Sequence, residues 1–185
     1  MVATLTSGVI PAEADVGLPT FAEAVEAHKA MVYSILWHFL RERSLAEEVA
    51  QEVFLELHKS WASMKSAKHI VFWLRRVASH RAIDFVRKRK NRPEMSFEET
   101  GEPTVLERVH DSFLSCYLER VVASLPEKQR IVIVLRYQEG LELEEIAKIL
   151  GIKVATVKTQ IFRALELLRA KTARGLRIGD IHDAV

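Results

Sequence analysis

The segment from Leu143 to Arg163 constrains the fold of this chain more than any other part of the sequence. Apolar residues recur in it at helical spacing and predict a buried face made of Ile146, Ala147 and Leu150. Ile152 is expected to fill the corner between the helices, and Val157 and Ile161 are expected to face the core. Gly151 lies where a tight turn between two helices needs a residue that tolerates a positive φ. The small side chain of Ala147 allows the second helix to approach closely. The pattern therefore predicts two short helices that pack against each other about Gly151.

The second of these helices carries side chains that point to a function. Four of them lie off the centre of its apolar stripe: Lys158, Thr159, Phe162 and Arg163. Exposed cations suit DNA phosphates or guanines, and an aromatic ring suits thymine methyls or sugars. This favours a DNA-reading helix-turn-helix over a purely structural helical hairpin. Phe162 is equally compatible with packing against Leu165 or the stem of Glu166.

The N-terminal half predicts a bundle of three helices. Two capping-box spacings mark helix starts, Thr20 with Glu23 and Ser44 with Glu47. The stripe of the second helix fades near Trp61, a loop is expected over residues 62–69, and a third helix ends before Pro93. Residues 1–20 have no sustained periodicity and are expected to form a flexible leader. The compact domain is therefore expected to span residues 21–92.

Charge is distributed unevenly between that domain and the next. Residues 75–92 contain eight Lys or Arg and one acid, for a net charge of +7, whereas residues 94–111 have a net charge of −5. Basic clusters neutralise phosphates, although a solvated helix face is the alternative. The acidic stretch over 93–111 contains Gly101 and two prolines, so it is predicted to be a flexible linker.

A second helical domain is expected over residues 112–175, followed by a tail over 176–185. Its first helix spans Ser112 to Ser124, and its second ends at Glu139, where Gly140 is a suitable residue to follow a helix. The predicted fold class is all-α, with two small helical domains joined by the acidic linker. Only 7 Gly and 5 Pro occur among 185 residues, which argues against a turn-rich β fold.

Several function classes are disfavoured by the sequence. Cys116 is the only cysteine, so no internal disulfide is possible, and no Cys/His spacing suits zinc. Neither a secretory signal in Met1 to Pro19 nor an apolar run long enough for a membrane span is found. No catalytic motif, catalytic residue, metal site or cofactor site is predicted. A non-enzymatic protein of the cytoplasm is expected.

Ordered motifs in both halves resemble the extracytoplasmic-function (ECF) group of bacterial sigma factors, over about residues 21–172. In the N-terminal half these are Glu48-Val-Ala-Gln-Glu-Val-Phe54, Phe72-Trp-Leu74 and Ala82-Ile-Asp-Phe-Val-Arg87. In the C-terminal half they are Leu125-Pro-Glu-Lys-Gln-Arg130, Leu135-Arg-Tyr137, Glu139-Gly-Leu141, Glu144-Glu-Ile-Ala147, Gly151 and Thr156-Val-Lys158.

The resemblance implies three binding surfaces. The polymerase-binding surface would contain Glu48, Gln51, Glu52, Phe54 and Leu57. The helix that binds the downstream (−10) promoter element would contribute Trp73, Arg75, Arg76, His80, Arg81, Arg87 and Lys88. The helix that reads the upstream (−35) element would contribute Lys153, Thr156, Lys158, Thr159, Phe162 and Arg163. Phe54 and Trp73 are also compatible with simple core positions. His80, Lys153 and Gln160 depart from the family pattern and leave the bases that would be read undetermined.

The implied partners are the RNA polymerase core, through the clamp helices of its largest subunit and the flap of its second largest, and promoter DNA. By analogy an anti-sigma factor is expected, and the free chain is expected to be a monomer because it has no sustained heptad seam. The acidic linker would mimic RNA in the polymerase exit path or act as a plain spacer. Two alternatives are a sigma mimic that sequesters an anti-sigma factor and a stand-alone helix-turn-helix regulator.

Overall fold

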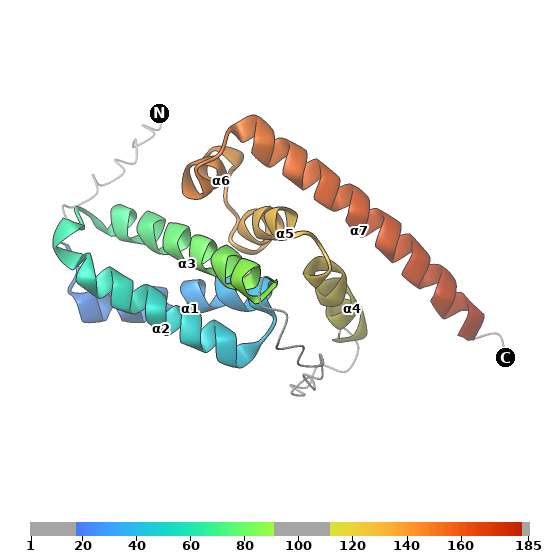
Figure 1. The fold of residues 1–185 in the computed structure, drawn as a ribbon, viewed down its shortest axis with the longest axis horizontal. Helices are drawn as coiled ribbons and strands as arrows, with labels where there is room; N and C mark the ends of the chain where they lie inside the picture. The colour runs from blue at the N-terminus through green and yellow to red at the C-terminus, as the bar shows by residue number, and fades with distance from the viewer. Residues whose placement is uncertain (1–17, 91–111, 183–185) are drawn as a thin grey trace, which may run out of the picture.

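The structure is a computed structural model that describes residues 18–90 and 112–182, and every element within these ranges is helical (Figure 1). The predicted all-α fold with two helical domains is confirmed. The predictions for residues 1–17 and for the linker over 93–111 fall outside the described residues. No helix in the described part of the chain has the length and apolar character that a membrane crossing requires.

The N-terminal domain packs three long helices around one apolar core. They are α1 (Phe21–Leu40), α2 (Arg43–Lys59) and α3 (Ala67–Lys90), with the short 3₁₀ helix η1 (Trp61–Ser63) between the last two. The Thr20 capping box is confirmed, because the Thr20 hydroxyl accepts from the Glu23 backbone and the Glu23 carboxylate accepts from the Thr20 backbone. Buried side chains on all three helices form the core: Val32, Ile35, Leu36, Phe39, Val49, Val53, Leu57, Ile70 and Leu74.

The predicted start of α2 at a Ser44 cap is wrong. Arg41 adopts a left-handed conformation with φ of 61°, which ends α1 abruptly and lets α2 begin at Arg43. Glu42 therefore occupies the N-cap position without a side-chain capping bond, and the Ser44 hydroxyl donates to the Glu42 carboxylate at 3.2 Å. The predicted loop over 62–69 is also too long, because α3 begins at Ala67.

The C-terminal domain comprises α4 (Ser112–Ala123), α5 (Glu127–Ile133), α6 (Leu143–Leu150) and α7 (Val154–His182). The π-helical turn η2 (Val134–Gln138) extends α5 and was not predicted. The expectation of two short helices about Gly151 is wrong for the second one, since α7 has 29 residues and continues past residue 175. Its apolar stripe continues through Ala164 and Leu168, which lets it pack along α4 and α5.

The two domains contact each other in the structure. Helix α3 packs on α1 and α2 and also contacts α5 and α6, so it lies between the two halves (Figure 1). Arg130 on α5 links them further, because it donates 2.9 Å to the Phe39 carbonyl of α1 and also donates to the Ala123 and Leu125 carbonyls. Its guanidinium lies 5.4 Å from the Phe39 ring centroid, and burial lowers its pKa. The apolar core is continuous across both domains.

Replacement of Gly151 by alanine is expected to destabilise the protein through backbone strain alone. Gly151 has φ of +66° and ends α6, and a Cβ built there meets no atom within 4 Å. The cost should therefore be about 1–2 kcal/mol, and Gly151→Asn should cost less because Asn tolerates this conformation. Denaturant unfolding of the full chain measures both, and an alanine variant as stable as the parent would contradict this account of the turn.

Candidate interaction surfaces

Helix α2 presents an acidic surface with one apolar side chain at its centre. Glu48, Gln51 and Glu52 are exposed, as a partner-binding surface requires. Leu57 is fully buried and belongs to the core, so its predicted contact with a partner is not available in this fold. Leu55, which the sequence analysis passed over, is 62% exposed instead. Phe54 is half-buried against the core, which favours its core interpretation.

Arg81 on α3 holds the acidic side chains of that surface. Its Nη2 donates to Glu56 Oε2 at 2.7 Å and its Nε donates to the same oxygen at 3.1 Å, while Nη1 lies 3.7 Å from Glu52. The hydrogen bonding of Arg81 to the Glu56 carboxylate is the main cause that raises the pKa of Arg81. A shallow hollow of about 250 Å³ lies among these residues, Leu55 and Lys59. Arg81 therefore belongs to the α2 surface in this structure rather than to a free basic face.

The other basic residues of α3 that were predicted to bind DNA fall into two groups. Arg75 and Arg76 contact the C-terminal domain, and the His80 Nδ1 lies 2.7 Å from the Arg76 carbonyl within the helix. Arg87 and Lys88 are exposed near the end of the helix. Trp73 is partly buried and packs against the core. The seven predicted side chains thus share one helix but not one exposed face.

The predicted reading face of α7 is exposed. Lys153, immediately before the helix, and the five predicted residues on it face solvent: Thr156, Lys158, Thr159, Phe162 and Arg163. Phe162 is 60% exposed, which favours the DNA-facing interpretation over packing against a neighbouring side chain. Val157 and Ala164 are buried beneath this face, as the stripe predicted.

Local hydrogen bonds fix the helix that supports α7. The Glu142 backbone donates to the Glu145 carboxylate at 2.9 Å, and the two residues form a capping box at the start of α6. Arg136 on η2 donates to the Leu141 carbonyl at 2.8 Å and pairs with Glu142 at 2.9 Å. Gly151 then ends α6 in the left-handed conformation. These bonds orient α6, and α6 in turn packs on α7.

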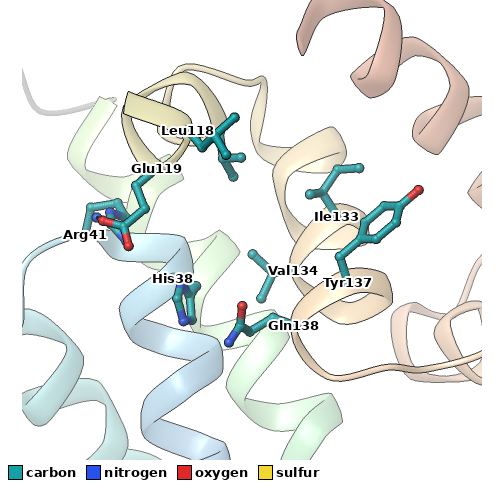
Figure 2. A pocket seen from close by; sticks show the side chains of 9 residues that line it. His38, Arg41, Leu118, Glu119, Ile133, Val134, Tyr137 and Gln138 are labelled. Carbon is teal, nitrogen blue, oxygen red and sulfur yellow. The ribbon is translucent and has the colours of Figure 1, made fainter. Parts of the chain in front are cut away.

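A largely apolar pocket of about 270 Å³ lies where α1 meets α4 and η2 (Figure 2). Arg41 and Glu119 lie beside each other at one edge of the pocket and form an ion pair, and Tyr137 lies on the opposite side (Figure 2). Burial lowers the pKa of His38 on its α1 wall, the nearby Arg41 adds to this, and Glu119 opposes it. The pocket holds no nucleophile paired with a base. Across the described ranges, no group of three metal-ligating side chains is found either.

Comparison with known proteins identifies both domains. The Sigma-70 region 2 family model matches residues 24–92, and the Sigma-70, region 4 model matches residues 117–168. The chain is 33% identical over 162 residues to the ECF RNA polymerase sigma factor SigW of Bacillus subtilis, with 80% of this chain and 87% of SigW covered. It is 31% identical over 147 residues to the sigma factor SigV of the same organism, with the same coverage.

Solved structures show the same fold. The structure of CnrH in complex with the cytosolic domain of CnrY matches with a TM-score of 0.62 at 21% identity, over 83% of this chain and 88% of that one. The sigma factor RpoE of Bartonella quintana, solved with the anti-sigma factor NepR, matches with a TM-score of 0.64 at 17% identity, over 81% and 94%. These comparisons do not favour the sigma mimic or the stand-alone regulator. The chain therefore belongs to the ECF group of the sigma-70 family of RNA polymerase sigma factors.

Proposed function

We propose that this sigma factor binds core RNA polymerase through α2 and selects promoters through α3 and α7, without catalysis of its own. The proposal rests on one observation: the chain has two chemically different exposed surfaces, which lie on different helices. An acidic surface with an exposed leucine lies on α2, and exposed cations flank Phe162 on α7. A stand-alone regulator needs no such α2 surface, and a mimic needs no DNA-facing cations.

The α2 surface is suited to the clamp helices of the polymerase largest subunit. Glu48 and Glu52 would pair with basic side chains of the partner, and Leu55, about one turn further along α2, would be buried against the partner. Arg81 would act as a positioning residue, because it already orients Glu52 and Glu56. The C-terminal domain would contact the flap of the second largest subunit. Both assignments place the action of the protein in the cytoplasm, where the polymerase works.

The promoter contacts follow from the two basic helices. Helix α7 would enter the major groove of the upstream element, where Lys158 and Arg163 hold phosphates or guanines and Phe162 contacts thymine methyls or sugars. Helix α3 would bind the downstream element as it opens, through cations and aromatic stacking. An anti-sigma factor remains an expected partner, since CnrH and RpoE were each solved with a second protein, NepR being named as an anti-sigma factor.

Leu55→Asp is expected to weaken binding to core polymerase by at least about tenfold, because apolar anchors at the centre of an interface commonly contribute more than 1 kcal/mol. Titration of labelled full-length protein with core polymerase measures this. Leu18→Asp, at another leucine exposed to 44%, is the matched control and should bind normally. These two leucine variants test the α2 surface more specifically than Glu52→Arg does, because Glu52→Arg would also place a second cation beside Arg81. Normal core affinity of Leu55→Asp would remove α2 from the interface.

Arg163→Ala is expected to reduce holoenzyme binding to a promoter duplex by about 1–3 kcal/mol if Arg163 grips a guanine. If it holds a phosphate instead, the loss should be uniform across sequences and the salt slope should fall by about one. Fluorescence anisotropy at several salt concentrations distinguishes the two cases. Arg169→Ala, an exposed arginine further along α7, controls for the loss of charge. Unchanged affinity together with an unchanged salt slope would show that Arg163 does not contact DNA.

A further inference from the structure

Thr159 lies at the centre of the exposed face of α7. Val157 and Ala164 are fully buried and mark the side of the helix that faces the core. Thr159 follows Val157 by two residues, so helical geometry turns its side chain by about 200° and directs it away from the core. Ala155 and Phe162, about one turn before and after it, are exposed on the same face. A helix that enters a groove with this face would therefore place Thr159 close to the base edges.

The hydroxyl of Thr159 uses its proton within the helix. Its Oγ1 donates to the Ala155 carbonyl at 2.9 Å. A threonine hydroxyl has one proton to donate and two lone pairs that accept. Because the proton is directed to the carbonyl of Ala155, the lone pairs are the part of the hydroxyl that remains for a ligand. Thr159 therefore presents an acceptor and a methyl group on the exposed side of α7.

The cations beside Thr159 have the opposite hydrogen-bonding character. Lys158 and Arg163 are exposed, and their side chains carry only donors. They suit phosphate oxygens or the N7 and O6 acceptors of guanine. Thr159 lies between them around the helix axis and offers an acceptor there. This face can thus distinguish bases that offer donors from bases that offer acceptors.

The major-groove edges of the four bases differ in what they offer to such an acceptor. Adenine and cytosine present an exocyclic amino group, N6 or N4, which donates. Guanine presents the acceptors N7 and O6, and thymine presents the acceptor O4 and a methyl group. A lone pair of Thr159 would find a partner on adenine or cytosine, whereas on guanine or thymine it would face another acceptor.

We propose that Thr159 is a specificity-determining residue for the upstream element, which it reads by accepting a hydrogen bond from the amino group of an adenine or a cytosine. The inference rests on the proposed entry of α7 into the major groove, and it adds the chemical class of base that is read at one position. To read guanine or thymine through a hydrogen bond, the hydroxyl would have to leave the Ala155 carbonyl and donate outward.

Thr159→Val and Thr159→Ser test the role of the hydroxyl. Valine keeps the branched shape and replaces the hydroxyl by a methyl group, whereas serine keeps a hydroxyl that can bond to the same carbonyl. Full-length protein bound to core polymerase is used to select promoter duplexes with a randomised upstream region. The parent should enrich adenine or cytosine at one position, and Thr159→Val should reduce that enrichment by at least about threefold. Thr159→Ser should retain it.

Removal of the amino group from the DNA is the second test. A selected adenine is replaced by purine, which lacks the 6-amino group, or a selected cytosine by 2-pyrimidinone, which lacks the 4-amino group. This replacement should weaken binding of the parent by at least about threefold more than binding of Thr159→Val, which cannot accept the bond. The comparison cancels the effect of the altered base on the duplex, because both proteins bind the same DNA. Fluorescence anisotropy measures the four affinities.

Two results would overturn the inference. One is selection of guanine or thymine by the parent at the position that Thr159→Val changes, which would show that the hydroxyl donates to the base. The other is a Thr159→Val variant that selects the same bases as the parent, whether its affinity falls uniformly or not at all. That result would show that Thr159 contacts a phosphate or no DNA. Circular dichroism should show the same helix content for all three proteins, since valine and threonine have similar helix propensities.

Arg163→Ala separates failure of this inference from failure of the proposed function. If Arg163→Ala weakens duplex binding but Thr159→Val leaves base selection unchanged, only the role of Thr159 is wrong. If neither variant changes duplex binding or base selection, α7 does not read the upstream element, and the inference falls with that assignment.

Discussion

The structure depends on α3, which carries many cationic side chains and also contributes buried apolar side chains to the core. Its apolar side, including Ile70 and Leu74, is fully buried, so its arginines must lie on the remaining faces. A buried charge without a partner is costly, and the partly buried Arg75 accordingly has an acidic neighbour, as does the exposed Arg81. Arg81 pairs with Glu56 of α2, and Arg75 pairs with Glu139. The pairing of α3 with both neighbours shapes both proposed binding surfaces.

The two pairings have different consequences for function. The Arg81 contact is short and half-exposed, and it fixes the acidic side chains of α2 in the positions in which a partner would meet them. The Arg75 contact is longer and more deeply buried, and it withdraws a cation from the surface. One helix thereby positions side chains of the proposed polymerase surface and also places one of its arginines against the C-terminal domain.

Local features of this fold were predictable from the sequence. The Thr20–Glu23 capping box, the turn at Gly151 and the buried stripe of α7 each depend on residues within one or two turns of each other. The exposure of Leu55 was also predictable from the sequence. Leu55 lies two residues from both Val53 and Leu57, so helical geometry places it on the face opposite to theirs. Leu57 lies four residues after Val53, so the same geometry predicts that it is buried with Val53.

Features that depend on distant residues were not predictable. The Arg75–Glu139 pair joins positions that no local pattern connects, and the same holds for Arg130 with the Phe39 carbonyl. The failure of the Ser44 cap has a similar origin, because the left-handed turn at Arg41 determines where α2 begins. The length of α7 follows from its packing on α4 and α5, which the sequence of the helix alone does not reveal.

The most direct test of the account is transcription by purified core polymerase, with and without this protein, from a library of promoter fragments. The account predicts transcripts that depend on the added protein. Their aligned start sites should share two short elements at constant spacing, one for α3 and one for α7. Failure to bind the core polymerase at all, in a folded preparation, would contradict the central claim that this chain directs transcription initiation.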